Sequence, residues 1–125
     1  FYPLMLEKEP HYKQLIEKHL LNPQEFNARW GVPSTSRDEK AYDPDQYWRG
    51  NIWMNDNTFI DLGLQKVMER DPDYLPARVF HAQLKDKIYS LYLKTGSREY
   101  FNPENSKGHG VKKFGWNGII KKMEG

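Results

Sequence analysis

The chain has 125 residues, a formal net charge of +2 and 38% hydrophobic residues. This length fits one domain, and the thin hydrophobic content predicts a modest core. Because basic and acidic residues alternate along most of the chain, we expect no nucleic-acid partner. No apolar run is long enough to cross a bilayer, so we expect no membrane partner either.

The absence of cysteine excludes disulfides and thiolate metal sites. It suits a reducing compartment, and we therefore expect a cytoplasmic location. The four histidines lack the paired spacing of zinc ligands, and the acidic residues lack the spacing of a calcium loop. The sequence also carries no phosphate-binding glycine loop and no nucleophile elbow. We predict no metal site and no cofactor.

Apolar residues recur at spacings of three and four in three segments, as on one face of a helix. The first segment runs from about Pro10 to Leu21, and proline suits a first turn. The second helix is expected to be capped by Asn51 and to end near Arg70. The third follows a tight connection, with a cap at Asp73 and a C-terminal stop at Gly96. The short link predicts an antiparallel helical hairpin.

Two irregular stretches surround this hairpin. Segment 27–46 has no sustained periodicity, and a loop of that length is uncommon without a function. A second stretch, rich in Asn, Gly, Pro and Ser, runs from Gly96 to about Lys113, and a short final helix is expected from Trp116 to about Lys122. No β pattern competes. We therefore predict an all-α fold of antiparallel helical hairpins, with residues 1–125 forming a single segment.

The topology gives the two irregular stretches a shared position. The loop before the second helix and the loop after the third lie at the same end of an antiparallel pair, so Trp48, Trp53 and Glu99 are expected to converge. A sugar ring has apolar faces and hydroxyl groups, so its site needs flat aromatic rings, polar groups and a carboxylate near the anomeric carbon. These residues predict one wall of a carbohydrate-cleaving pocket. The second carboxylate that glycoside hydrolysis requires is not evident.

From the residues alone, each candidate also has a structural interpretation. Glu99 is either a base that activates water or a solvated loop carboxylate, and the tryptophans either line a pocket or fill the core. Asn55, Asp56 and Asn57 lie in the first turns of the second helix, where the helix dipole also favours carboxylates, so ligand contact is the less favoured interpretation. A non-catalytic glycan-binding or helical interaction module remains the alternative to an enzyme.

The chain resembles the C-terminal part of the catalytic domain of the α-glucosidase I and mannosylglycerate hydrolase family, which is related to the trehalases. The resemblance covers nearly the whole chain. It rests on Phe1–Leu4, Gly31–Ser34, Tyr47–Trp53 and the stretch from Glu99 to Trp116. Its most specific part is Tyr-Trp-Arg-Gly followed by Ile-Trp. Arg98 and Asn102 replace an aromatic residue and an aspartate that are common in the family.

The resemblance implies an inverting glycoside hydrolase that acts on an α-linked glucoside or mannoside. Glu99 matches the general base that deprotonates the attacking water. The positions that match sugar-contacting residues are Tyr47, Trp48, Gly50, Trp53 and Trp116. The family's general acid, an Asp, lies in an upstream segment. Its catalytic domain is a six-hairpin (α/α)6 toroid, of which this chain would be the closing part.

This comparison predicts that the isolated chain is catalytically inactive, because proton donation to the leaving oxygen contributes a large rate factor. It also predicts apolar helix faces that need a partner. That partner would be the N-terminal part of the catalytic domain or a second copy of the chain. The start at Phe1 without an initiator Met suggests a processed product or an excised piece.

Overall fold

The computed structural model describes residues 1–6 and 8–124. Its elements, in chain order, are η1 (Tyr2–Met5), α1 (Tyr12–Gln14), η2 (Leu15–Leu20), α2 (Met54–Arg70), α3 (Leu75–Thr95), β1 (Arg98–Phe101), β2 (Gly108–Lys112) and η3 (Gly115–Glu124). The segments η1 and η3 are 3-10 helices, and η2 is a π-helix that continues α1. Among the described residues, no helix has the length and apolar character that crossing a membrane requires.

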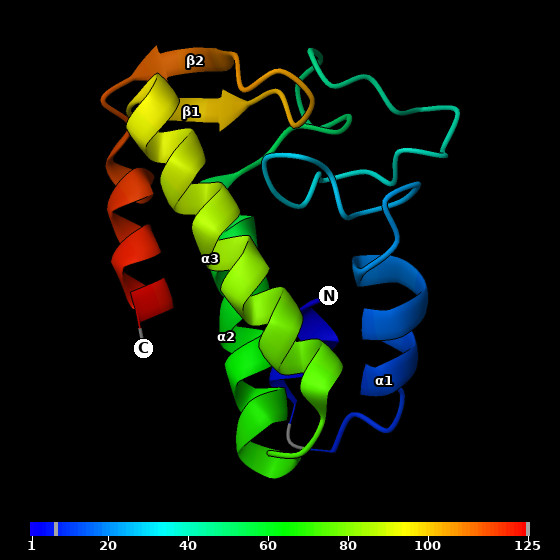
Figure 1. Cartoon of the computed structure of the whole chain (residues 1–125). Helices are drawn as coiled ribbons and strands as arrows, with labels where there is room; N and C mark the ends of the chain where they lie inside the picture. The colour runs from blue at the N-terminus through cyan, green and yellow to red at the C-terminus, as the bar shows by residue number, and fades with distance from the viewer. Residues whose placement is uncertain (7, 125) are drawn as a thin grey trace.

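The antiparallel hairpin of α2 and α3 forms the centre of the molecule (Figure 1). The apolar stripes predicted on these helices face inward: Leu64, Phe80 and Leu84 are fully buried. The segments η1 and η3 also pack on α2, so α2 is enclosed on several sides. A Cβ at Gly63 would lie 2.8 Å from that of Leu4, so glycine allows η1 to approach this helix closely.

The predicted first helix is confirmed as the continuous segment of α1 and η2, which begins two residues later than expected. Its buried residues are Ile16 and Leu20. The hydroxyl of Tyr12 donates to Asp71 Oδ2 at 2.5 Å, beside the turn between α2 and α3. This contact attaches the first helix to the end of the hairpin.

Both predicted N-terminal caps are wrong. Helix α2 starts after Trp53 and α3 after Tyr74, and neither residue makes a side-chain capping bond. Asn51 is buried, and its Nδ2 donates instead to the carbonyl of Pro44 at 2.9 Å, so this amide holds the preceding loop. The predicted stop at Gly96 is confirmed, since this residue ends α3 with a φ of 78°.

The all-α prediction is incomplete because β1 and β2 form a two-stranded antiparallel sheet. Figure 1 shows this hairpin over the C-terminal end of α3. Ile52 extends the sheet by one bridge: its N–H donates to the Phe101 carbonyl at 2.8 Å and its carbonyl accepts from Phe101 at 3.0 Å. The strands are short and the second is rich in glycine, so neither shows the alternation from which strands are recognised.

The long loop before α2 is irregular, as predicted, and lies beside the β-hairpin (Figure 1). The side chain of Asn57 secures its middle, since it accepts from the Val32 N–H at 2.8 Å and donates to the Val32 carbonyl at 2.9 Å. Arg37 secures its later part through an ion pair of 2.7 Å with Glu104, in the turn between the strands. The loop is thus fixed to both α2 and the hairpin.

Candidate active site

Five aromatic rings from the long loop, the start of α2 and the β-hairpin form one continuous ring cluster. Its members are Tyr47, Trp48, Trp53, Tyr100 and His109. The rings of Trp48 and Trp53 are nearly parallel, with centroids 4.0 Å apart. Trp53 also stacks on Tyr100 at 5.2 Å. The antiparallel bridge between Ile52 and Phe101 explains this contact, because it places Trp53 beside Tyr100.

Exposure differs sharply among these rings. Trp53 is only 5% exposed, because Trp48 covers one side and Tyr100 stacks on another. Trp48 and Tyr47 remain 46% and 56% exposed. The indole N–H of Trp53 is buried and has no hydrogen-bond partner, which is unusual for such a donor. Trp48 therefore offers an open aromatic surface to solvent, whereas Trp53 is covered by Trp48.

The backbone at Trp48 is strained, with a φ of 56° in the left-handed region that side chains rarely occupy. Two backbone hydrogen bonds of the next residue, Arg49, maintain it: the Arg49 N–H donates to the Gln46 carbonyl at 3.1 Å, and the Arg49 carbonyl accepts from the Asp43 N–H at 2.6 Å. Strain of this kind persists only where the surroundings enforce it, and it is concentrated at functional sites.

Gly50 also has a backbone role. Its φ is 139°, and a Cβ there would collide with the ring of Tyr42. Its N–H donates to Ser34 Oγ at 3.2 Å. The predicted site residue Gly50 therefore shapes the turn that presents Trp48, and its assignment as a sugar contact stays a prediction.

Glu99 lies on β1 at an irregularity in the strand pairing. Two residues of β2, Gly110 and Val111, stand opposite it, and such bulges re-aim side chains beside active sites. The Val111 N–H donates to Glu99 Oε2 at 3.1 Å, and the Tyr47 hydroxyl lies 3.5 Å from Oε1. The carboxylate is thus oriented toward the ring cluster, and the predicted convergence of the two irregular stretches is confirmed.

Gly110 lies in the stretch that carries the family resemblance, but no role in the site was predicted for it from the sequence. Its φ is 66°, and a Cβ at this position would collide with Glu99 Oε2. Only glycine leaves the carboxylate its observed position. The signal was present in the sequence as one of two glycines in Gly-His-Gly, but a glycine pair in an irregular segment does not reveal which carboxylate it accommodates.

Trp116 does not join the ring cluster: among the described residues, no aromatic contact connects it to the other rings. It stands at the start of η3, is 57% exposed and lines a shallow apolar depression with Ile119. The next residue, Asn117, exchanges two hydrogen bonds of 3.0 Å with the backbone of Arg98. This pairing places η3 beside the strand that carries Glu99, and the sugar-binding role of Trp116 stays a prediction.

The polar residues in the first turns of α2 have different surroundings. Asn57 is fully buried and holds the long loop, which favours the structural interpretation. Asp56 accepts from the Tyr2 hydroxyl at 2.7 Å, and burial raises the pKa of this carboxyl group. It borders a pocket of about 280 Å³, lined by Phe26 and Pro33 among others.

The chain also matches known proteins in sequence. Residues 1–117 match the mannosylglycerate hydrolase MGH1-like glycoside hydrolase domain. The mannosylglycerate hydrolase of Thermus thermophilus is 31% identical over 93 residues, which cover 74% of this chain and 20% of that protein. The mannosyl-oligosaccharide glucosidase of Saccharomyces cerevisiae is 25% identical over 139 aligned residues, which cover 98% of this chain and 17% of that protein. The chain thus spans about a fifth of the length of these relatives.

A solved structure resembles the fold as well. The GH63 mannosylglycerate hydrolase from Thermus thermophilus in complex with glucose aligns with a TM-score of 0.62 and 28% identity. The alignment covers 78% of this chain and 23% of that one. Since the family match extends over nearly all of the sequence, the chain belongs to the mannosylglycerate hydrolase MGH1-like glycoside hydrolase family.

Proposed function

We propose that this chain supplies the general base and an aromatic sugar platform to an inverting glycoside hydrolase that acts on an α-linked glucoside or mannoside. The observation that carries the proposal is the position of Glu99, oriented by Val111 and Tyr47 at the edge of the ring cluster. A carboxylate beside an exposed aromatic face supplies two of the groups that a sugar-cleaving site uses, and the second carboxyl group is still needed. The names of two relatives, a mannosylglycerate hydrolase and a glucosidase, support the substrate class.

In this mechanism the open face of Trp48 stacks on the apolar face of a sugar ring. Glu99 accepts a proton from a water molecule as the water oxygen bonds to the anomeric carbon. The bond from that carbon to the leaving oxygen breaks, and an acid protonates the leaving oxygen. In inverting enzymes the two carboxyl groups stand about 6.5–9.5 Å apart, which leaves room for the water. We assign the acid to a segment outside these 125 residues.

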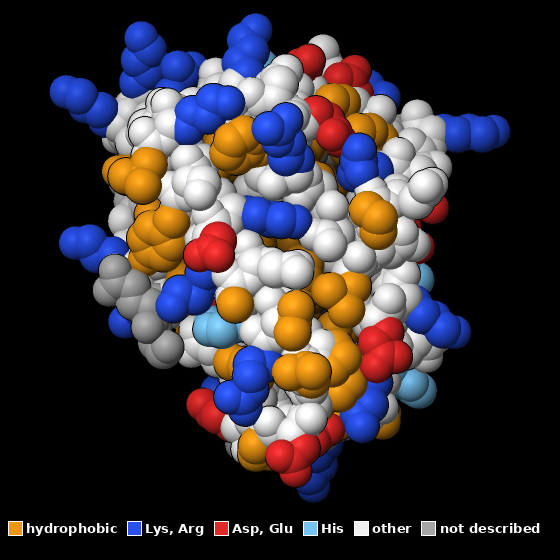
Figure 2. Space-filling view, in the orientation of Figure 1, with side chains coloured by type: hydrophobic (Ala, Val, Ile, Leu, Met, Phe, Trp, Pro, Cys, Tyr) orange, Lys and Arg blue, Asp and Glu red, His pale blue; other side chains and the backbone are white. Residues whose placement is uncertain are grey.

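The exposed surface of α3 supports assembly with such a segment. Leu75, Val79 and Leu93 on this helix are 62%, 42% and 83% exposed. Figure 2 shows hydrophobic side chains at the surface among charged ones on the face where α3 lies in Figure 1. In an (α/α)6 toroid, α2 and α3 would form one of the six hairpins, and neighbouring hairpins would cover part of this surface. The remainder of a catalytic domain is therefore the proposed partner.

The reaction is tested in the complete protein that carries this chain, with α-glucosides and α-mannosides as substrates. Nuclear magnetic resonance spectra recorded within the first minutes identify the anomer of the released sugar, and we expect the inverted β-anomer. Release of the α-anomer would contradict the inverting mechanism.

Azide provides a separate test of the base, because it attacks the anomeric carbon without losing a proton. The Glu99→Ala variant should be almost inactive in water and should recover turnover in azide, with a glycosyl azide as product. The Tyr47→Phe variant retains the carboxylate and serves as the control that azide does not accelerate. If azide fails to restore Glu99→Ala, the carboxylate has a role other than that of a base.

A non-catalytic glycan-binding module is the second candidate, and the strained, exposed Trp48 favours it. This function needs no acid from another segment. It predicts that sugars alter the tryptophan fluorescence of the 125-residue chain and that Trp48→Ala abolishes the response. No response to a panel of glucosides and mannosides would exclude it.

A further inference from the structure

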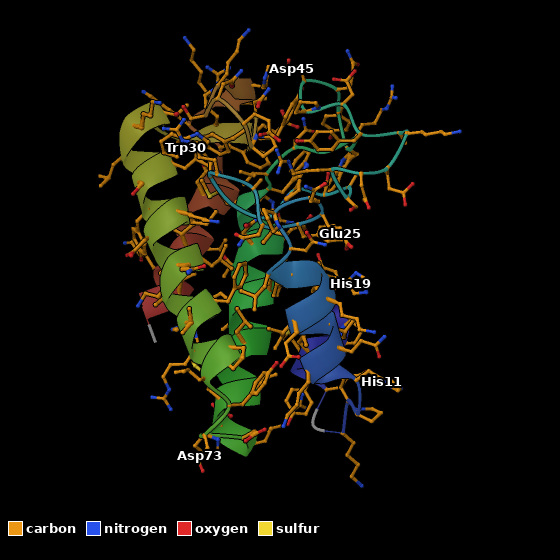
Figure 3. All side chains as sticks on the ribbon, turned by 45° about the vertical axis from the view of Figure 1, so that its right-hand side comes forward. His11, His19, Glu25, Trp30, Asp45 and Asp73 are labelled. Atoms are coloured by element: carbon orange, nitrogen blue, oxygen red, sulfur yellow. The ribbon has the colours of Figure 1, made fainter. Side chains whose placement is uncertain are left out.

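Another contact between the long loop and the β-hairpin lies two residues before Tyr47. Asp45 Oδ1 accepts a hydrogen bond of 2.8 Å from Asn102 Nδ2 and lies 3.0 Å from His109 Nε2. Figure 3 labels Asp45 on the loop, beside the hairpin. The loop is therefore attached to the hairpin on both sides of Gln46: through Asp45, and through the contacts of Tyr47.

The His109 contact continues into the ring cluster. The imidazole lies nearly parallel to the ring of Tyr100, with an interplanar angle of 11° and a centroid distance of 5.4 Å. Tyr100 in turn meets Tyr47 edge-on, at 5.4 Å. Tyr47 thus contacts Tyr100 directly, whereas Asp45 is connected to Tyr100 through the imidazole of His109. A shift of the loop would alter both.

The surroundings of Asn102 fix which group is the donor in its hydrogen bond with Asp45. Asn102 is 2% exposed, and its Oδ1 accepts from the N–H groups of Glu104 and Asn105 at 2.8 and 3.2 Å. The other end of the amide must then be the donor that faces Asp45. The hydrogen bond from Asn102, together with His109 and Lys107 nearby, holds the pKa of Asp45 below its ordinary value.

We propose that Asp45 and His109 are positioning residues for Glu99, because they hold the loop so that the Tyr47 hydroxyl stays beside the carboxylate. The inference rests on the proposed function of Glu99 as a base. The ion pair is too exposed to contribute much to stability, since the Asp45 side chain is 56% exposed and surface pairs are worth roughly 0–1 kcal/mol. The contact between Asp45 and His109 therefore affects the position of the loop rather than the stability of the fold. At 3.5 Å, the contact between Tyr47 and Glu99 is long and has little strength of its own to hold that geometry.

Asn102→Asp is a matched variant for this inference. The new carboxylate still accepts from the two backbone N–H groups, so the turn is retained. It can no longer donate to Asp45 and it repels that residue. Asp45→Asn weakens the same contact from the other side. Glu39→Gln is the control, because it changes an exposed carboxylate of the same loop without touching this contact.

Two substitutions of His109 separate the effect of its ring stacking from the effect of its hydrogen bond to Asp45. His109→Gln keeps a donor near the position of Nε2 but loses the stacking, whereas His109→Phe keeps a ring over Tyr100 and loses the donor. If the bond to Asp45 is what matters, Gln should retain most of the wild-type kcat and Phe should not. A His109→Phe variant with wild-type kcat would overturn the role of His109.

The experiment measures kcat and KM in the complete protein. Asp45→Asn and Asn102→Asp should each lower kcat about tenfold, since small displacements of a catalytic group have large effects. We expect KM to stay within about twofold and Glu39→Gln to match the wild type. The decisive comparison uses Tyr47→Phe. If Asp45 acts through Tyr47, adding Asp45→Asn to Tyr47→Phe lowers kcat no further. Additive losses, or a wild-type kcat for Asp45→Asn, would overturn the proposal.

A structural measurement separates this proposal from the function of Glu99. Near-ultraviolet circular dichroism of the complete protein, taken as the difference between each variant and the wild type, reports the packing of the ring cluster, whatever the reaction. Asp45→Asn and Asn102→Asp should change this spectrum while far-ultraviolet signals stay constant, and Glu39→Gln should leave both unchanged. An unaltered near-ultraviolet spectrum would overturn the positioning role. If the complete wild-type protein hydrolyses no glycoside, the proposed function fails, and this spectrum alone decides whether Asp45 orders the loop.

Discussion

The indole of Trp48 lies flat on that of Trp53, with ring centroids 4.0 Å apart and an angle of 7° between the planes. This contact covers the buried ring and turns the other face of Trp48 toward solvent, where its side chain is 46% exposed. The two tryptophans therefore have different roles. Trp53 is fixed between other rings, and Trp48 is the exposed ring that we propose as the sugar-contacting surface.

Replacing Trp48 with alanine should expose Trp53 to water. We expect the tryptophan emission of the chain to shift to longer wavelength, because a buried indole becomes hydrated. The free energy of unfolding should fall by about 0.5–1.5 kcal/mol for the lost ring contact, in addition to the lost buried area. Urea denaturation measures this change. Trp116→Ala is the control, since Trp116 is exposed and separate from the ring cluster; equal shifts in both variants would contradict the assignment.

Gly110→Ala tests the space around Glu99. The new methyl group collides with the carboxylate, so we expect a large loss of kcat in the complete protein. A backbone penalty of roughly 1 kcal/mol for a left-handed alanine accompanies it. Gly96→Ala is the control for a substitution at a glycine with positive φ, because Gly96 has a φ of 78° and open space where the methyl group would stand. Both variants should lose stability, and only Gly110→Ala should lose turnover. Wild-type turnover in Gly110→Ala would show that the position of the carboxylate is unimportant.

The contact between Asp61 on α2 and His81 on α3 should be important for folding. Asp61 Oδ1 and His81 Nδ1 are 2.7 Å apart, and the Asp61 side chain is completely buried. Without His81, the buried Asp61 carboxyl group keeps only the hydrogen bond from Gln65 among the described residues, and a buried polar group that loses a partner typically costs about 1–3 kcal/mol. We therefore expect His81→Ala to lower the free energy of unfolding by several times the effect of Asp86→Ala, an exposed change on the same helix. Equal effects in chemical denaturation would refute this role.

The attachment of α1 to the hairpin predicts a dependence on acid. The hydrogen bond from Tyr12, with Lys13 nearby, holds the pKa of Asp71 below its ordinary value. A carboxylate with a lowered folded-state pKa stabilises the fold fully above its unfolded-state pKa of about 3.9 and loses this contribution as pH falls through the folded-state value. The wild type should therefore lose more stability than Asp71→Asn between pH 6 and pH 2. Parallel losses, measured by urea unfolding at both pH values, would contradict this.

The helices were predictable because their apolar residues keep one face over many turns, as Leu64, Phe80 and Leu84 do. The caps were not. Asn51 has the chemistry of a cap, but its amide is engaged by the Pro44 carbonyl, and this contact depends on the path of a loop that has no periodicity. The β-hairpin was missed because its second strand is Gly-His-Gly-Val-Lys, whose pairing depends on the bulge opposite Glu99.

The site was predictable in part. Chain topology placed Trp48, Trp53 and Glu99 at one end of the helical hairpin, and the structure brings them together through Tyr47. The order of stacking was not predictable, since nothing in the spacing says which indole covers the other. The space that Gly110 leaves for the Glu99 carboxylate also depends on the register of β1 and β2, which the sequence does not reveal.

The most direct test of the account is the turnover of Glu99→Gln in the complete protein, compared with Glu104→Gln. Both substitutions remove one negative charge from the β1–β2 region, but Glu104 pairs with Arg37 away from the ring cluster. We predict that Glu99→Gln lowers kcat/KM by about 100-fold to 10,000-fold, as loss of a general base does, and that Glu104→Gln retains most of the activity. A Glu99→Gln enzyme within a few fold of the wild type would contradict the assignment of Glu99 as the base.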